Sequence, residues 1–121
     1  MEQGPGMARG LSWGDVRLVE FGRPDKTRPV LVLTRSRAIE VLNGIMVAPI
    51  TSTIHGNRAE VQLGTAEGLK RPSAAKLDAI QTVDKSRVGR FLGSVSPARS
   101  GEIRSAVLFS MGIEHDDDLD S

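Results

Sequence analysis

Short apolar runs separated by turn-forming polar residues make up most of the chain from Trp13 onwards. Runs of this length, bounded by glycine, proline or basic turns, predict β-strands. The run from Pro29 to Leu33 is continuously apolar, as expected of a central strand. The run from Ala59 to Leu63 alternates between apolar and polar residues, as a half-buried strand does. The pattern predicts strands at 16–21, 29–33, 45–51, 59–63, 75–83 and 88–95.

Two segments have the spacing of helices. Residues 36–42 predict a helix of about two turns, which Asn43-Gly44 then stops. A longer helix is predicted after Ser96, a good N-cap that is followed by Pro97 at the first helical position. Short strands with one closing helix predict a mainly β protein, a compact β-barrel with added helices, rather than a doubly wound α/β fold. The apolar stripe of the closing helix consists of Ile103, Ala106, Val107 and Met111.

The 121 residues suit one domain with a substantial core. We expect a flexible glycine-rich lead at 1–11, a folded domain at 12–113 and an acidic tail at 114–121. The chain has no cysteine, so it has neither a disulfide nor a thiol nucleophile. No apolar run approaches the roughly 18–20 residues that span a bilayer. The first residues also lack a signal-like pattern, so we expect a cytoplasmic protein without a membrane partner.

Charge is distributed unevenly along the chain. Residues 114–121 contain five of the fifteen acidic residues and no lysine or arginine. Residues 1–113 therefore carry 16 basic and 10 acidic groups, a net charge of +6. A basic body with an acidic tail is typical of a protein that binds a polyanion such as nucleic acid. A solvated surface followed by a disordered end explains the same charges equally well.

Most common catalytic constellations are missing from the sequence. There is no tyrosine, and of the two histidines one lies in the acidic tail. The nucleophile-elbow, Walker and dinucleotide-binding patterns are absent. The tail segment His115-Asp116-Asp117-Asp118 has the residue types of metal ligands, but tails of this kind are usually solvated. We therefore predict no metal ion and no other cofactor.

The remaining candidate is an arginine combined with a cluster of hydroxyls. Arg28 stands at the start of one apolar strand, and the next strand ends in Thr51, Ser52 and Thr53. A guanidinium forks onto two phosphate oxygens, and a hydroxyl donates to a third oxygen or to the leaving group. Together they can stabilise the charge that develops when a ribose 2′-OH attacks the adjacent phosphorus. Alternatively, Arg28 is a surface cation and the three hydroxyl residues are ordinary strand formers.

A series of motifs in a fixed order resembles the MazF/PemK family of bacterial toxins, the toxic half of type II toxin–antitoxin pairs. The resemblance extends from about Trp13 to Ile113. Each motif is weak alone, but together, in this order and spacing, the motifs are specific. They are Gly14-Asp15-Val16, Arg28-Pro29-Val30-Leu31-Val32-Leu33, Ala48-Pro49-Ile50-Thr51-Ser52, Leu77-Asp78-Ala79-Ile80-Gln81-Thr82-Val83-Asp84-Lys85 and Arg90-Phe91-Leu92-Gly93-Ser94-Val95-Ser96.

The resemblance implies an SH3-like barrel with a C-terminal helix, a homodimer, and a metal-independent, sequence-specific endoribonuclease that inhibits translation and growth. It implies cleavage of single-stranded RNA by 2′-OH attack, which leaves 2′,3′-cyclic phosphate and 5′-OH ends. The family's catalytic arginine falls on Arg28 and its catalytic threonine on Thr51. The resemblance also implies a cognate antitoxin whose acidic, disordered segment blocks the RNA groove.

Further substrate contacts are expected around this pair. The basic loop before the arginine is shorter than in many members of the family, and Asp25 is its only acid. We expect Arg23 and Lys26 of this loop to contact RNA phosphates. Ser52 and Thr53, on the hydroxyl edge, are expected to lie near the RNA. We expect a base to stack on Phe21 and the Asp78 carboxylate to form a hydrogen bond with a base.

Two other functions stay open. Gyrase-poisoning toxins use the same barrel to bind a protein rather than to cut RNA. Their last residues form the end of a helix and include a tryptophan, whereas this sequence ends in an acidic tail. A plain nucleic-acid-binding SH3-like module would bind RNA in a salt-sensitive way and leave it intact. RNA cleavage distinguishes the enzyme from both alternatives.

Overall fold

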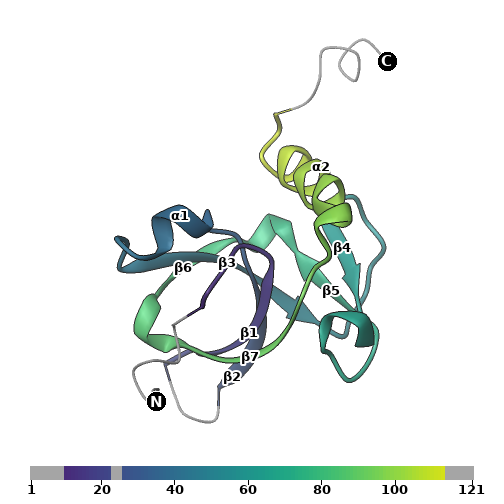
Figure 1. Ribbon diagram of the computed structural model, residues 1–121. Helices are drawn as coiled ribbons and strands as arrows, with labels where there is room; N and C mark the ends of the chain where they lie inside the picture. Colours follow the sequence, from purple (N-terminus) through teal and green to yellow (C-terminus); the bar gives the residue numbers. More distant parts are fainter. Residues whose placement is uncertain (1–9, 23–25, 114–121) are drawn as a thin grey trace.

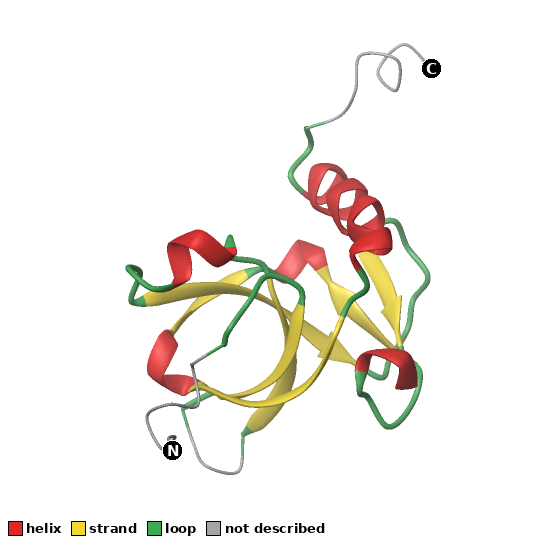
Figure 2. Ribbon diagram, viewed as in Figure 1, coloured by secondary structure: helices red, strands yellow, loops and turns green. Residues whose placement is uncertain are grey.

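The computed structural model describes residues 10–22 and 26–113. Within these residues, seven strands form one curled antiparallel sheet of barrel-like shape, with the longest helix at one end (Figure 1, Figure 2). This confirms the predicted mainly β barrel with a C-terminal helix. The strands are β1 (Asp15–Glu20), β2 (Thr27–Val32), β3 (Gly44–Thr51), β4 (Glu60–Leu63), β5 (Ser73–Lys76), β6 (Gln81–Asp84) and β7 (Val88–Ser94). The helices are α1 (Ser36–Ile39) and α2 (Ser100–Ser110), with the 3₁₀ turns η2 (Thr65–Glu67), η3 (Leu77–Ala79), η4 (Lys85–Arg87) and η5 (Pro97–Arg99).

The long strand β3 organises the sheet. It pairs with β6 from Gly44 to Val47, with β2 from Val47 to Pro49, and with β5 through Ile50 and Thr51. The strand order is β4-β5-β3-β2-β1-β7, with β6 as a further neighbour of β3. Because one strand serves three neighbours at successive positions, the sheet curls along β3 instead of lying flat (Figure 1).

Aliphatic residues fill the core on both faces of β2. Leu31 belongs to a cluster that α2 closes, whereas Val30 and Val32 belong to a second cluster with Ile45 and Val88. All three β2 residues are fully buried. The continuously apolar run is therefore a central strand, as predicted.

The predicted single strand at 75–83 is wrong, because the structure divides it into β5, the turn η3 and β6. Both strands pair with β3, Ala75 opposite Ile50 and Gln81 opposite Val47. Gln81 therefore follows Ala75 by six residues, whereas their partners Ile50 and Val47 are only three residues apart in β3. The turn η3 accommodates the extra residues. The apolar pattern does not reveal this break, because the leucine of the turn is as buried as a strand residue would be.

The predicted helix at 36–42 is shorter than expected. The observed α1 has four residues and no side-chain hydrogen bond that caps its start. Only Ile39 of this helix is buried, and Val41 beyond it is 82% exposed. The helix ends where Lys85 Nζ donates to the Ile39 carbonyl oxygen at 2.8 Å. With so little apolar surface to bury, the spacing does not sustain a second turn.

The C-terminal helix begins as predicted. Ser96 Oγ accepts a hydrogen bond from the Ala98 N–H at 3.3 Å, and η5 leads directly into α2. Ile103 and Ala106 are buried against the sheet. The predicted stripe is wrong at Met111, which follows the last helical residue and is 63% exposed. Neither α2 nor any other helix of the described residues is long and apolar enough to cross a membrane.

Candidate functional site

A groove of about 1340 Å³ lies between the start of β2, the end of β3, the connection from β4 to β5, and β7. We call it the basic groove, because five of its side chains are cationic and none of its described lining residues is acidic. Such a lining suits a polyanion that also has apolar parts. The apolar side chains are those of Leu18, Phe21, Pro29, Pro49, Ile50, Leu69 and Leu92, and the polar ones are those of Lys26, Arg28, Thr51, Ser52, Lys70, Arg71, Ser73, Gln81 and Arg90.

The register between β2 and β3 brings Arg28 and Thr51 to the same end of the sheet. The two strands are antiparallel, and their last pair at this end is Val30 with Pro49. Arg28 comes two residues before Val30 and Thr51 two residues after Pro49, so both lie just beyond this pair at the same end of the sheet. Pro29 and Pro49 lack the N–H that a ladder hydrogen bond needs, so the pairing stops there. The two residues beyond it line the basic groove.

Arg28 and Thr51 both have hydrogen-bonding capacity left for a ligand. Arg28 is exposed, and its guanidinium has no hydrogen-bond or ion-pair partner among the described residues. Thr51 is half-buried, and its Oγ1 accepts a hydrogen bond from the Thr53 N–H at 3.1 Å. That contact orients the Thr51 side chain and leaves its hydroxyl proton for donation. Both residues can therefore donate hydrogen bonds to an oxygen-rich ligand in the groove.

Three further cations of the groove come from distant parts of the chain. Lys70 and Arg71 lie between β4 and β5, and Arg90 lies in β7. All three are exposed and form no ion pair with another described residue. Sequence reasoning does not find them, because Lys70-Arg71-Pro72 is visibly basic but nothing local shows where this connection lies on the barrel. The exposed Gln81 in the same groove is missed for the same reason.

The other predicted site residues lie in different places. Phe21, Lys26 and Ser52 line the basic groove. Thr53 is exposed and follows Ser52, but it is not among the lining residues. Arg23, and Asp25 with it, lie outside the described residues. Within residues 10–22 and 26–113, no group of three or more His, Cys, Asp or Glu side chains is placed to hold a metal ion.

Asp78 lies away from the basic groove, in a second groove of about 690 Å³ between η3 and α2. Its carboxylate is 3.9 Å from Lys76 Nζ. Asp78 lies in the turn η3, and within this chain it does not share a groove with Arg28 and Thr51. We call this second groove the apolar groove; apart from Asp78, Arg104 and two serines it is lined by Trp13, Leu33, Met46, Leu77, Ile80, Ile103, Val107, Leu108 and Met111.

Comparison with known proteins assigns the sequence to a family. The family model described as PemK-like, MazF-like toxin of type II toxin-antitoxin system matches residues 12–111. The chain is 34% identical over 92 residues to Endoribonuclease MazF3 of Mycobacterium tuberculosis, which covers 76% of this chain and 89% of that protein. It is 37% identical over 101 residues to Probable endoribonuclease MazF5 of the same species, which covers 83% of this chain and 88% of that protein.

Solved structures share the fold. The Mycobacterium tuberculosis toxin MazF-mt6 matches with a TM-score of 0.78 and 30% identity, covering 84% of this chain and 99% of that one. An endoribonuclease from a mycobacterial species, solved in complex with its cognate antitoxin, matches with a TM-score of 0.74 and 22% identity, covering 86% and 97%. The residues matched by the family model include the whole described lining of the basic groove. The chain therefore belongs to the PemK-like, MazF-like family of toxins from type II toxin–antitoxin systems.

Proposed function

We propose that this chain is an endoribonuclease that binds single-stranded RNA in the basic groove and cleaves it there. The observation that carries the proposal is that Arg28 and Thr51 lie at the same end of the sheet and line one groove, whose described lining has five cations and no carboxylate. Relatives of the chain are named endoribonucleases. RNA also matches the groove chemically, because its phosphates suit the cations and its bases suit the apolar side chains.

The proposed reaction uses the 2′-OH of the RNA itself as the nucleophile. Its oxygen attacks the adjacent phosphorus, the bond from phosphorus to the 5′-oxygen breaks, and 2′,3′-cyclic phosphate and 5′-OH ends result. The proton that the 2′-OH loses balances the proton that the 5′-oxygen gains. Arg28 forks onto the non-bridging phosphate oxygens, whose negative charge grows in the transition state. Thr51 donates its hydroxyl proton to one of these oxygens or to the leaving group.

In this proposal, the other groove residues together with Arg23 and Thr53 position the RNA strand. Phosphate contacts hold the RNA without reading its sequence, so they make the affinity depend on salt. Stacking and hydrogen bonding to splayed bases then select the cleavage site. Phosphates are contacted by Arg23, Lys26, Lys70, Arg71 and Arg90, a base stacks on Phe21, and Ser52 and Thr53 contribute hydrogen bonds.

The test of this function is incubation of the purified protein with a long mixed-sequence RNA in the presence of EDTA. We expect discrete cuts at one short motif, with cyclic-phosphate ends and rates that EDTA does not change. RNA that is bound but stays intact would instead indicate a plain nucleic-acid-binding module. RNA that is neither bound nor cut by a protein that stops cell growth would move the target to a protein such as DNA gyrase.

We also propose a cognate antitoxin whose acidic, disordered segment covers the basic groove. The cations that suit RNA phosphates attract carboxylates as well, and the net charge of +6 over residues 1–113 favours such a partner. A segment that orders on binding can cover a long groove and exclude RNA by direct competition. RNA and the antitoxin are both synthesised in the cytoplasm, so we propose that the protein acts there.

We propose that a second copy of the chain covers the apolar groove, which makes the protein a homodimer. Met46 and Met111, both in this groove, are 46% and 63% exposed, so large apolar side chains meet water in the single chain. Asp78 and Arg104 lie in the same groove. A two-fold interface is self-complementary, so Asp78 of each copy can pair with Arg104 of the other.

The dimer proposal predicts that Met111→Lys raises the dimer dissociation constant at least about tenfold, because an unpaired charge buried at the interface is costly. Light scattering over a range of protein concentrations measures the change in mass. Val41→Lys is the matched control, because Val41 is 82% exposed and lies outside both grooves. A dimer that Met111→Lys leaves unchanged would place the interface elsewhere.

A further inference from the structure

Residues 64–71, which we call the wall segment, lie between β4 and β5 and contribute Gly68, Leu69, Lys70 and Arg71 to the lining of the basic groove. Gly68 in this segment has φ +90° and closes the turn η2. It lies so close to β7 that an added Cβ would be 2.0 Å from the Leu92 carbonyl oxygen. The wall segment therefore rests directly on β7, and only a small space separates the two backbones.

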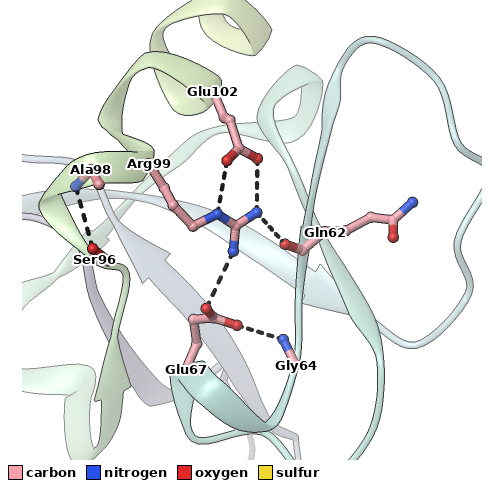
Figure 3. Close-up of polar contacts among 7 residues, drawn as sticks. All are labelled: Gln62, Gly64, Glu67, Ser96, Ala98, Arg99 and Glu102. Carbon is pink, nitrogen blue, oxygen red and sulfur yellow. Dashed lines mark hydrogen bonds and ion pairs between the residues drawn. The ribbon is translucent and has the colours of Figure 1, made fainter.

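On its other side, the wall segment is tied by Arg99 of η5 (Figure 3). Arg99 Nη1 donates to Glu67 Oε2 at 3.2 Å, and Nη2 donates to the Gln62 carbonyl oxygen at 2.7 Å. Nε and Nη2 also donate to the two carboxylate oxygens of Glu102, at 2.9 and 2.8 Å. One guanidinium thus connects η2, β4 and α2.

Glu67 links Arg99 to the backbone of the wall segment, because its carboxylate accepts hydrogen bonds from both. Its second oxygen, Oε1, accepts a hydrogen bond from the Gly64 N–H at 2.6 Å. The Gly64 carbonyl oxygen accepts in turn from the N–H groups of Glu67 and Leu69, at 3.0 and 3.1 Å. The Glu67 side chain is only 8% exposed, so without Arg99 it would be a buried carboxylate lacking its counter-charge.

We infer that Arg99 is a positioning residue for RNA binding, which acts through Glu67 to hold the wall segment so that Lys70 and Arg71 face the basic groove. The inference rests on the proposed function, because it takes these two cations to contact RNA. Arg99 itself does not line the groove. The fixed fork of a guanidinium suits the role, because it donates to four acceptor atoms on three residues at once, which a lysine ammonium cannot do in the same geometry.

Glu102 offers a matched control, because it accepts hydrogen bonds from Arg99 but forms no hydrogen bond or ion pair with the wall segment. Its side chain is 54% exposed. The hydrogen bond from Arg99 holds the pKa of Glu102 below its ordinary value of 4.5, and the same bond raises the pKa of Arg99. Both groups therefore stay charged at neutral pH, and Glu102→Gln removes a charge while leaving the contact between Arg99 and Glu67 in place.

Hydrogen exchange measured by NMR tests the structural part of the inference. In Arg99→Ala we expect the amides of Glu67, Gly68 and Leu69 to exchange at least about tenfold faster, because local opening of the wall segment becomes easier. Glu67→Gln should act in the same direction, because an amide has one acceptor oxygen where the carboxylate uses two. Glu102→Gln should change the rates less than about twofold. We call the pair Arg99 and Glu67 the clamp; unchanged exchange in both Arg99→Ala and Glu67→Gln would overturn the inference.

A double-mutant cycle tests the functional part, with mixed-sequence 2′-O-methyl RNA as a probe that has no 2′-OH nucleophile. Arg99→Ala is expected to weaken binding about three- to tenfold, and to lower the slope of log affinity against log salt by up to about 1.4, since two contacts contribute about 0.7 each. In the Lys70→Ala/Arg71→Ala background, Arg99→Ala should weaken binding less than about 1.5-fold, because coupled residues are not additive. Equal effects in both backgrounds would overturn the inference.

The two measurements keep the inference separate from the proposed function. Wild-type protein that fails to bind the probe would overturn the proposed function, and with it the claim that the clamp serves RNA. The exchange experiment needs no RNA and tests the clamp independently. Thermal melting shows whether each variant is folded at the assay temperature. If Arg99→Ala unfolds, Arg99→Lys takes its place in both experiments, with smaller changes expected in the same directions.

Discussion

Replacing Arg28 with alanine is expected to slow RNA cleavage by about 10²- to 10³-fold, the usual cost of removing one preorganised donor from a developing negative charge. Binding should weaken much less, because several other cations of the basic groove still contact phosphates. The loss should therefore fall mainly on the rate constant for cleavage rather than on the affinity. Single-turnover cleavage of a synthetic RNA that contains the recognised motif measures the two separately.

Arg37→Ala is the control for this experiment, because Arg37 is exposed on α1 and lies outside both grooves. It removes the same charge from the protein and should leave cleavage within about twofold of wild type. Thr51→Val tests the second half of the pair, because it keeps the branched shape and removes only the hydroxyl. If Arg28→Ala cleaved RNA at the wild-type rate, the site would have to be sought elsewhere on the protein.

Replacing Gly68 with alanine is expected to lower the free energy of unfolding by about 2–5 kcal/mol. A Cβ at this position would lie 2.0 Å from the Leu92 carbonyl oxygen and 2.5 Å from its carbon, and both are backbone atoms that cannot rotate away. The left-handed backbone, with φ +90°, adds to the strain for a residue with a side chain. Thermal melting should show a fall of at least about 8 °C.

Two other glycines make the Gly68 result interpretable. Gly64→Ala is the control, because a Cβ there meets nothing within 4 Å and its φ of −161° is extended backbone. It should leave stability within about 0.5 kcal/mol of wild type. Gly93→Ala should destabilise through the clash alone, because its Cβ would lie 2.4 Å from the Glu67 carbonyl oxygen without a left-handed φ. A stable Gly68→Ala protein would mean that the wall segment can move away from β7.

The strands could be predicted because their signals are local. The buried run that starts at Pro29 and the alternating run that starts at Ala59 show their character within five residues. Where a prediction failed, the deciding contact was distant. The strand at 75–83 breaks because its two halves pair with different parts of β3, and the helix at 36–42 ends early, at Ile39, whose carbonyl oxygen accepts a hydrogen bond from the distant Lys85. Neither partner is visible in the segment itself.

The centre of the candidate site could also be anticipated, and its surroundings could not. Arg28 and Thr51 stand out because one begins and the other finishes an apolar strand, and the pairing of these neighbouring strands then brings both to the same end of the sheet. Lys70, Arg71 and Arg90 reach the same groove from segments whose place on the barrel depends on the whole fold. Their basic character was evident in the sequence, but their position was not.

By itself, the sequence determined the family, the mainly β architecture and the pair of residues at which chemistry is proposed, because these depend on residue types in order along the chain. Only the tertiary structure decided which charges share a surface. Arg17 counts among the basic residues, yet it is 5% exposed and pairs with Asp15 at 3.1 Å. Arg99 looks like an ordinary helix-start arginine, yet it supports the groove wall through Glu67. Charges act through space, so their neighbours are known only once the chain has folded.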